Sequence, residues 1–517
     1  MTWGSTTPAS RTRTHADWLS LRLALLVSVI SLAWSAALIT NFSFAPFGTE
    51  KLGLVFNDMA LRLLKLDFTI DPTLISFEAF VRDGRTYTYF GIFPALLRIP
   101  AVMAGADAYT LARTSCLLAL WIVTFATIRL TQAVMGPALR TSEARSIAVV
   151  AVIGVSFSGP AIYVLASASI YHEVVFWGAA GTAVFNWIAI RRACGGNPLS
   201  RSDISLLATI SGCVLLTRIT CGVALYLGMA LLLIWGPVIA MPVWSLRQYL
   251  TGLGRSLRQA APGLTIAAAF VLLEAGVNFG RWGTPFVVVP MQYYQMLLDD
   301  PLHGERLAHL AQHGALDLAR IPIAALHYGL GLKVDRIFPA FFLEHFDGIE
   351  GPRFVALLCT PLMVLCAAHG IYATLFGRYR AGILPPLVVA NGVAFGMALA
   401  LPWLCLRYTF DGWGFLALAS ALGVSHLVQR ANVAPPAGRM GRTCVCRLTI
   451  ALTLLGVVVS HATLLRYKIN YSGTTPEVRY WLSQEIQPLL CPQMPLTPSV
   501  KLGDFVPLVT TNCPPLW

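Results

Sequence analysis

The chain has 517 residues, of which 37 are Lys or Arg and 24 are Asp or Glu, so that 12% are charged. About a quarter of a soluble protein is charged, whereas this chain has half that share, with 56% apolar residues and a mean hydropathy of +0.68. This composition excludes a soluble enzyme and a disordered protein, and it indicates a polytopic membrane protein. The net charge of +13 forms no basic cluster of the kind that follows nucleic acid phosphates.

Eleven apolar segments are long enough to cross the roughly 30 Å of hydrocarbon in a bilayer, which predicts an all-α membrane protein with about eleven transmembrane helices. They fall at residues 20–40, 109–133, 146–166, 172–190, 204–219, 221–243, 262–280, 354–377, 382–401, 411–428 and 448–465. The stretch 89–105 is shorter and contains Pro94, Arg98 and Pro100, so we interpret it as an interfacial or re-entrant segment. The first segment is interpreted as a signal anchor because ten more follow.

The distribution of charge predicts the orientation of these helices. If the N-terminus is cytoplasmic, the inner loops carry sixteen Arg and two acids, whereas the outer loops 41–108 and 281–353 carry fifteen acids and twelve bases. This is a positive-inside pattern, and we expect a bacterial inner-membrane protein with its C-terminus outside. Residues 1–465 are then one transmembrane domain and 466–517 an outer tail. In the tail, Cys491 and Cys513 are either a disulfide or two thiols.

The first outer loop begins with an amphipathic segment, residues 51–66. Its polar stripe contains Lys51, Asp58, Arg62 and Lys65 at helical spacing, opposite a wide apolar face. Such a helix is expected to lie along the membrane–water boundary. Asp58 has two interpretations, an i,i+4 ion pair with Arg62 or a carboxylate available for chemistry.

Residues 77–90 predict a small hairpin in the same loop. Asp83-Gly84 is a strong two-residue hairpin turn, and Tyr87 and Tyr89 alternate with threonines on the return strand. Their amphipathic rings suit the headgroup level, so they are either membrane anchors or substrate contacts.

Charged residues at the predicted outer ends of the spans are the candidates for function. His172 and Glu173 lie at the outer mouth of a span, where Glu173 is either functional or a helix N-terminal acid that the helix dipole favours. Arg113, Arg218 and Arg407 lie close to hydrocarbon, and Arg281 opens the second long outer loop on the same predicted side. They would either clamp a lipid-linked phosphate through bidentate hydrogen bonds or extend to the headgroups.

With these features the chain resembles the glycosyltransferase C (GT-C) superfamily. Its members are polytopic enzymes that include protein O-mannosyltransferases and lipid A aminoarabinose transferases. The resemblance is carried by the span pattern, the two long outer loops, Asn57-Asp58-Met-Ala, the run from Asp83 to Pro94, and His172-Glu173. This chain has Asn-Asp at 57–58 and no paired acids there.

The resemblance implies a GT-C-like fold and transfer of a sugar from a polyprenyl-phosphate donor to an acceptor on the outer, periplasmic or lumenal, face. It implies Asp58 as the general base, with Glu173 as the second candidate. His172, Tyr87 and Tyr89 would contact substrate, and Arg218, Arg281 and Arg407 would stabilise the departing phosphate.

No metal ligand set is assigned, although a divalent metal stays open, and His309 and His313 are interpreted as surface residues because they lack an HExxH pattern. The expected partners are a polyprenyl-phosphate-linked sugar and membrane lipid, with no nucleic acid. Two alternatives remain, a transporter or flippase of a lipid-linked sugar and a non-catalytic membrane subunit. The sugar, the acceptor and the oligomeric state stay open.

Overall fold

The computed structural model describes most of the chain between residues 15 and 470. The described ranges are 15–135, 142–194, 199–239, 245–286, 289–295, 311–350, 355–377, 384–433 and 439–470, together with residues 304 and 308. Cys491 and Cys513, and the tail from residue 471 onward, lie outside the described residues.

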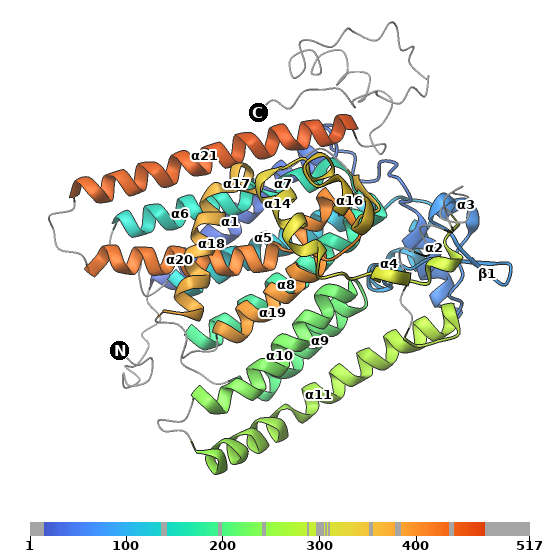
Figure 1. The fold of residues 1–517 in the computed structure, drawn as a ribbon, viewed down its shortest axis with the longest axis horizontal. Helices are drawn as coiled ribbons and strands as arrows, with labels where there is room; N and C mark the ends of the chain where they lie inside the picture. The colour runs from blue at the N-terminus through green and yellow to red at the C-terminus, as the bar shows by residue number, and fades with distance from the viewer. Residues whose placement is uncertain are drawn as a thin grey trace, which may run out of the picture.

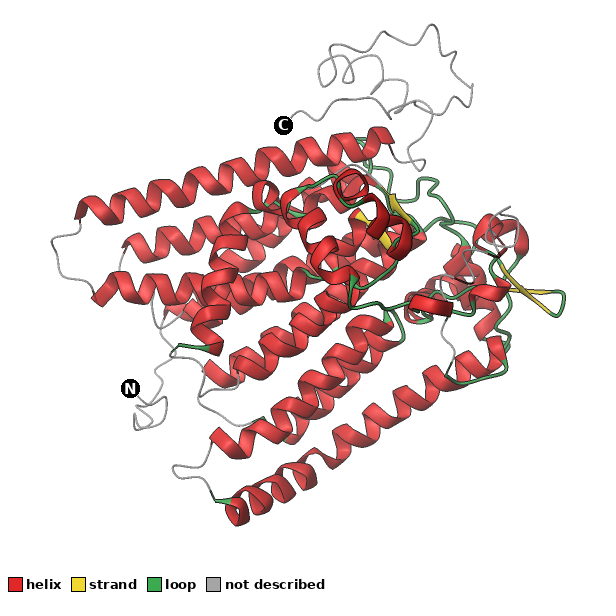
Figure 2. Cartoon of the chain, viewed as in Figure 1, coloured by secondary structure: helices red, strands yellow, loops and turns green. Residues whose placement is uncertain are grey.

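The molecule is a bundle of long helices that run side by side, as Figures 1 and 2 show. Each of the predicted apolar segments coincides with a helix, which confirms the all-α membrane fold. These helices are α1 (His15–Ile39), α5 (Ala112–Met135), α6 (Ser142–Phe157), α8 (Ile170–Cys194), α9 (Arg201–Leu215), α10 (Ile219–Ile239), α11 (Leu246–Trp282), α18 (Pro361–Leu375), α19 (Leu384–Leu399), α20 (Trp413–Val433) and α21 (Arg439–Asn470). Within the bundle, α5 packs against α8, α18 against α20, and α9 against α11.

Not every helix has the length of a full span. Among the described residues, 7 helical segments are long and apolar enough to cross a membrane: Leu21–Ile39, Ala112–Met135, Ser146–Ala166, Ile170–Cys194, Ile219–Val238, Leu246–Trp282 and Cys446–Lys468. Helices α9, α18 and α19 have 15 or 16 residues, and the apolar part of α20 is also short. The count of eleven spans therefore stays a prediction. Helix α21 continues to Asn470, beyond the predicted domain boundary at 465.

The first long loop folds into short elements at one end of the bundle, which we call the loop end. These are α2 (Val55–Leu63), α3 (Pro72–Ile75), η1 (Ser76–Glu78), β1 (Phe80–Arg82), β2 (Arg85–Tyr87), α4 (Phe93–Ala101) and the π-helical η2 (Val102–Ala106). Figure 1 shows α2, α3, α4 and β1 together at one side of the bundle. The amphipathic helix is shorter than residues 51–66, and Leu64 and Leu66, beyond its last turn, are exposed. The segment 89–105 forms a short helix packed on α2, not a span.

The hairpin is formed as the sequence predicts. Strands β1 and β2 pair antiparallel, with Phe80 opposite Tyr87 and Arg82 opposite Arg85. Asp83 and Gly84 both have positive φ, 52° and 70°, as a type I′ turn requires. Asn, Asp and Gly tolerate this conformation best, which explains the choice of residues.

The second long loop covers the same end of the bundle. It contains η5 (Met291–Tyr293), α14 (Arg320–Leu330), α15 (Val334–Ile337), α16 (Pro339–His345), β3 (Gly348–Glu350) and α17 (Ala356–Cys359). Strand β3 pairs in parallel with β4 (Trp403–Cys405), which leads into η6 (Leu406–Phe410). This short parallel pair joins the second loop to the connection between α19 and α20, and the sequence did not predict it.

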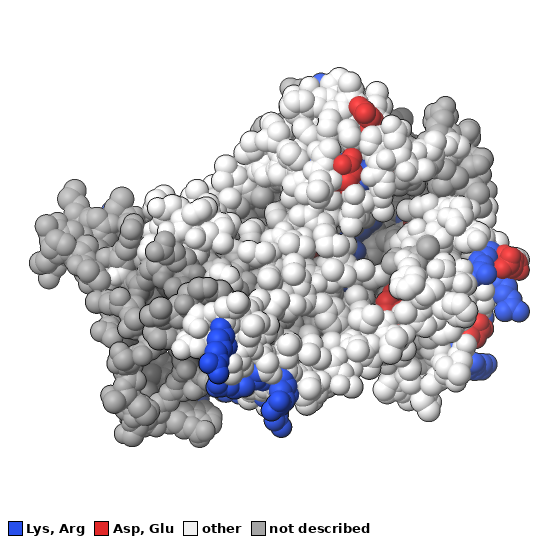
Figure 3. Space-filling model, turned by 60° about the horizontal axis from the view of Figure 1, so that its bottom comes forward, with Lys and Arg blue, Asp and Glu red and all other residues white. Residues whose placement is uncertain are grey.

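The two ends of the bundle differ in charge. Figure 3 shows Lys and Arg without acids toward the end opposite the loop end, and both signs at the loop end. Exposed Arg247, Arg255 and Arg258 of α11 belong to the first group. This separation agrees with the charge distribution from which the orientation was predicted.

Helices α18 and α20 approach so closely that only glycine fits at their contact. A Cβ added to Gly423 would lie 1.8 Å from the carbonyl oxygen of Cys366, and one added to Gly370 would lie 1.9 Å from that of Ala419. We expect Gly423→Ala to lower the free energy of unfolding by about 1–3 kcal/mol, because the helices must move apart. Thermal unfolding of the detergent-purified protein measures this. Gly396→Ala in α19, where a Cβ meets nothing within 4 Å, is the control and should leave the unfolding temperature unchanged or slightly higher.

Candidate functional site

A buried ion pair links the first loop to α8. Arg98 of α4 and Glu173 in the first turn of α8 are 3% and 0% exposed, and the Arg98 Nη2 lies 2.6 Å from the Glu173 Oε2. Arg98 also donates through Nη1 to the Gly53 carbonyl at 3.0 Å and to the Asn57 Oδ1 at 2.7 Å. Glu173, the second candidate base, is therefore engaged in holding α4 and the start of α2 against the bundle.

Asn57 explains why the chain has Asn-Asp and not two acids at this place. Its buried amide Nδ2 donates to the carbonyls of Asp107 and Tyr109, both at 2.8 Å, while its Oδ1 accepts from Arg98. A carboxylate here would face two carbonyl oxygens with no proton to donate. The amide is the group that connects α2, α4 and the start of α5.

Asp58 lies on the polar side of α2 and its side chain is 15% exposed. Both of its oxygens accept from the Arg62 Nε, at 3.0 and 2.9 Å, and Oδ2 also accepts from the Asp71 backbone N–H at 2.8 Å. The i,i+4 ion pair is thus formed, and it also fixes the chain before α3. The assignment of Asp58 as general base stays a prediction.

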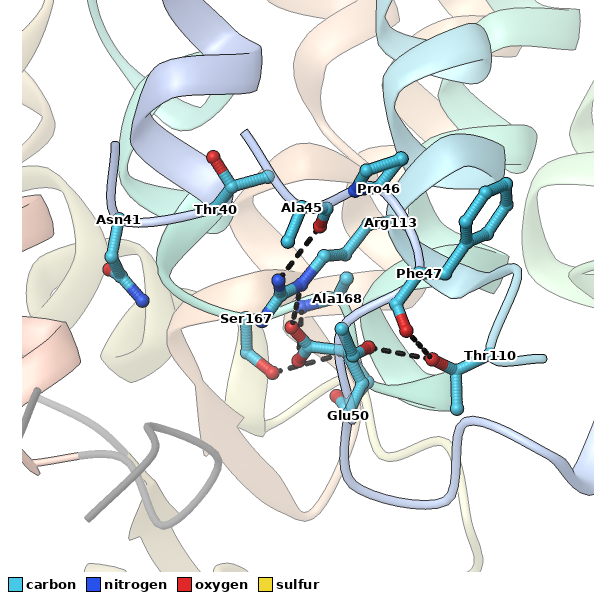
Figure 4. Close-up of polar contacts among 12 residues, drawn as sticks. Thr40, Asn41, Ala45, Pro46, Phe47, Glu50, Thr110, Arg113, Ser167 and Ala168 are labelled. Carbon is cyan, nitrogen blue, oxygen red and sulfur yellow. Dashed lines mark hydrogen bonds and ion pairs between the residues drawn. The ribbon is translucent and has the colours of Figure 1, made fainter. Parts of the chain in front are cut away.

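Glu50 and Arg113 form a second buried pair, shown in Figure 4. The Arg113 Nε donates to Glu50 Oε1 at 2.6 Å, and the Ala168 backbone N–H donates to Oε2 at 3.2 Å. Burial raises the pKa of the Glu50 carboxyl, although Arg113 and the Ala168 N–H act in the opposite direction. The pair joins the start of the first loop to α5 and to the segment before α8.

Arg218 and Arg281, two of the predicted phosphate-binding arginines, are bonded to protein groups at the loop end. Arg218 forms a bidentate pair with buried Asp411 and lies over the Tyr408 ring. Arg281, buried at the end of α11, donates to the Phe90 carbonyl at 3.0 Å and contacts the Met59 sulfur. Both therefore stabilise the fold around the site.

Arg407 has a different environment. Its guanidinium lies 4.7 Å from the Tyr171 ring centre and 5.3 Å from that of Tyr408. Cation–π contacts of this kind hold a cation in place without a full opposing charge. The hydroxyl of the same Tyr171 donates to Glu78, so Arg407 and Glu78 both contact this tyrosine.

Glu78 is the carboxylate at the centre of this group. It is 6% exposed, and its Oε1 accepts from the hydroxyl groups of Tyr171 and, at 3.1 Å, Tyr294. Three segments far apart in the chain therefore meet at Glu78: η1, the start of α8, and the second long loop. We call Glu78, Tyr171, Tyr294 and Arg407 the Glu78 cluster. Figure 3 shows a hollow in the surface with Lys or Arg atoms visible inside it.

The electrostatics of the Glu78 cluster are unusual. Burial raises the pKa of the Glu78 carboxyl, and the hydrogen bonds from Tyr171 and Tyr294 together with Arg407 only partly reverse this. Burial, and then the nearby Glu78 charge, raises the pKa of the Tyr89 hydroxyl well above its ordinary value. A carboxylate with a raised pKa inside a cluster of donors is typical of acid–base sites.

Of the remaining predicted substrate contacts, Tyr87 and His172 are buried and Tyr89 is half-buried. Tyr87 is 8% exposed and packs on Trp282, with ring centres 5.7 Å apart. Tyr89 stacks on Phe90 at 4.4 Å, beside the Glu78 cluster. His172 is fully buried, with its Nδ1 2.7 Å from the Ser169 hydroxyl. Of these three, Tyr89 is the one that the structure brings to the cluster.

Sequence reasoning did not single out Glu78, Tyr294 or Asp411. Glu78 stands between aromatic residues in the hairpin segment, and an acid in such a run was a usable signal. Asp411 follows Arg407 and Tyr408 closely in the sequence, but nothing local connects it to Arg218.

The Arg98–Glu173 pair can be tested by removing one partner at a time. Arg98→Met should destabilise the protein by about 3–5 kcal/mol, because it leaves the Glu173 charge buried and unpaired. Thermal unfolding in detergent measures the loss. The double variant Arg98→Met/Glu173→Gln should recover a large part of it. A double variant that is no more stable than Arg98→Met would show that the charge of Glu173 is not the cause.

No protein-family model and no curated protein matches this sequence. Among solved structures, the chain is similar to the oligosaccharyltransferase of Archaeoglobus fulgidus. The apo form has a TM-score of 0.50 and 15% identity, covering 91% of this chain and 59% of that one. The form tethered to an acceptor peptide with an NVT sequon has a TM-score of 0.50 and 13% identity, covering 91% and 58%. The complex with zinc and sulfate has a TM-score of 0.50 and 14% identity, covering 89% and 55%.

This chain thus spans less than two thirds of the length of the structures that it matches. At such low identity the likeness concerns the arrangement of helices and not the chemistry. It agrees with the fold that the sequence resemblance implied, and the chain has the GT-C fold.

Proposed function

We propose that the protein is a glycosyltransferase that moves a sugar from a polyprenyl-phosphate donor to an acceptor hydroxyl at the loop end. The observation that carries the proposal is the Glu78 cluster, in which a carboxylate with a raised pKa and a cation lie within one group of tyrosines. The GT-C fold supports the reaction class, since the similar structures are oligosaccharyltransferases. The outer face, a bacterial inner membrane and a cytoplasmic N-terminus are part of the proposal.

The reaction needs a base and a cation on opposite sides of the sugar. The acceptor hydroxyl gives its proton to a carboxylate as its oxygen bonds to the anomeric carbon. The bond from that carbon to the phosphate oxygen breaks, and polyprenyl phosphate leaves with the bonding electron pair on that oxygen. A guanidinium beside the phosphate stabilises the negative charge that develops there.

Glu78 suits the role of base better than the two acids that the resemblance implied. Asp58 accepts from Arg62 and a backbone N–H, and Glu173 is paired with Arg98, so their negative charge is already neutralised. The tyrosine hydroxyls that reach Glu78 bond to Oε1, and the proposal uses Oε2 to receive the proton.

Arg407 is the proposed phosphate-binding cation. The rings of Tyr171 and Tyr408 lie beside its guanidinium and orient it. Arg218 and Arg281 support the site without contacting the phosphate. Arg218 packs on the same Tyr408 ring, and Arg281 bonds to the Phe90 carbonyl next to Tyr89. Tyr89 would contact the sugar as a hydrogen-bond donor, and Tyr294, whose hydroxyl donates to Glu78, could contact it only as an acceptor. His172 and Tyr87 would lie behind the site and support its shape.

One of the similar structures contains zinc. In this chain, the acids Asp58 and Glu173 each hold an arginine, which disfavours a cation between them. The proposed step therefore uses Arg407 for charge stabilisation and needs no metal at the Glu78 cluster. The identity of the sugar and whether the acceptor is a peptide or a lipid are left to experiment.

Replacing Glu78 tests the proposed base. Glu78→Gln keeps the size of the side chain and should lower the transfer rate by about 10²–10⁴-fold, because the acceptor proton has no recipient. The measurement is release of polyprenyl phosphate from synthetic polyprenyl-phosphate mannose, glucose or aminoarabinose by protein in liposomes. Asp58→Asn is the matched control and should change stability more than rate. Full activity in Glu78→Gln with loss in Asp58→Asn would return the role of base to Asp58.

The same liposomes separate the alternatives. A flippase would move the lipid-linked sugar between leaflets without releasing polyprenyl phosphate, and Glu78→Gln would leave that movement intact. A non-catalytic subunit would show neither activity in any variant.

The pH dependence gives an independent test of Glu78. A base works only when deprotonated, so activity should fall as the pH drops through the raised pKa of Glu78, at a higher pH than for an ordinary glutamate. Tyr294→Phe removes a hydrogen bond that lowers this pKa, so it should move the acidic limb of the kcat profile to higher pH. An unchanged limb in Tyr294→Phe would exclude Glu78 as the titrating group.

A further inference from the structure

The second long loop contains a group of metal-ligating side chains away from the Glu78 cluster. His313, Asp317 and His345 each offer a ligand atom, and these atoms lie within 4.8 Å of one another. The His345 Nδ1 is 2.7 Å from the Asp317 Oδ2, and the His313 Nδ1 is 3.8 Å from the same oxygen. The side chains are 13–16% exposed, so they lie under the surface but within reach of ions.

The spacing of these atoms fits the first coordination shell of a small transition metal. Bonds of roughly 2.0–2.2 Å from zinc to nitrogen and oxygen in a tetrahedron separate the ligand atoms by about 3.4 Å. The distances of 2.7 and 3.8 Å lie on either side of that value. Side-chain movements of under about 1 Å would therefore bring the atoms to a shared ion.

The ligands are also held in place by their neighbours. The Ala319 N–H donates to Asp317 Oδ1 at 2.9 Å, which leaves Oδ2 directed at the histidines. The ring of Phe341 stacks on His345 with centres 4.0 Å apart, and the rings of His313 and His345 meet edge to face at 4.7 Å. Second contacts of this kind orient ligands in known metal sites.

The backbone around the group is tied to the chain that leads to Arg407. Arg320, fully buried, donates to the carbonyls of His345 at 2.5 Å and Ala400 at 3.1 Å. The Asp317 N–H also donates to the Ala400 carbonyl at 3.0 Å. An ion on these three residues would thus join α16 to the segment before α14, which is itself bonded to Ala400 at the end of α19.

We propose that His313, Asp317 and His345 bind a zinc ion that holds the second long loop in place on the bundle. Two imidazole nitrogens and one carboxylate oxygen are a ligand set that favours zinc over magnesium or calcium, which prefer oxygen ligands alone. Water completes the fourth position. The ion stabilises the loop and takes no part in sugar transfer, so the inference stands independently of the proposed function.

The test is zinc binding by the full-length protein in detergent after treatment with a chelator. Titration against a chromogenic zinc competitor should show a saturable site in the wild type, and zinc but not magnesium should raise the unfolding temperature. His345→Ala should weaken zinc binding by at least about 10-fold and abolish the thermal shift. Asp317→Asn, which preserves the shape of the side chain, should do the same if His345→Ala folds poorly.

The control is His327→Ala, which removes a histidine of α14 whose Nδ1 contacts the Leu332 carbonyl. This variant should lose some stability but keep its response to zinc. Absence of a saturable zinc site in the wild type would overturn the proposal. Equal zinc binding by the wild type, His345→Ala and Asp317→Asn would also overturn it, because the ion would then lie elsewhere.

Discussion

The loop end depends on the pairing of buried charges. Arg98 with Glu173, Arg113 with Glu50, and Arg218 with Asp411 each join a loop or short helix to the mouth of a long helix. An unpaired charge at this depth is too costly to bury, so the loops can settle only where every partner is met. The ion pairs thus determine where the first loop lies on α5 and α8, and where the α19–α20 connection lies beside α10.

This pairing also decides which groups stay reactive. A carboxylate that faces a guanidinium loses more of its basicity than one that accepts hydrogen bonds from tyrosine hydroxyls. Glu78 is of the second kind, and the rings beside Arg407 orient that cation in a similar way. Aromatic side chains therefore give the Glu78 cluster much of its geometry.

Local sequence patterns predicted what depends on local interactions. Apolar length gave the positions of the helices, Asp83-Gly84 gave the hairpin, and the spacing of Asp58 and Arg62 gave their ion pair. The contacts that build the site join residues 75, 63 and 193 positions apart, and Tyr294 lies 216 positions from Glu78. A local sequence pattern contains no information about contacts between residues this far apart. For this reason the sequence did not distinguish Glu78 from other loop acids, and His313 was interpreted as a surface residue.

The second loop has the larger part in arranging the site. Tyr294 forms an isolated bridge to Phe80 and stacks on its ring at 4.9 Å, so the loop reaches Glu78 from the side of the hairpin. The same loop pairs through β3 with β4, which leads directly to Arg407. The tyrosine that donates to the proposed base and the strand paired with the chain before the proposed cation therefore belong to the same loop. Since transfer needs both groups placed to within about 1 Å, the interactions that fasten this loop to Ala400 belong to the site as much as the charged residues do.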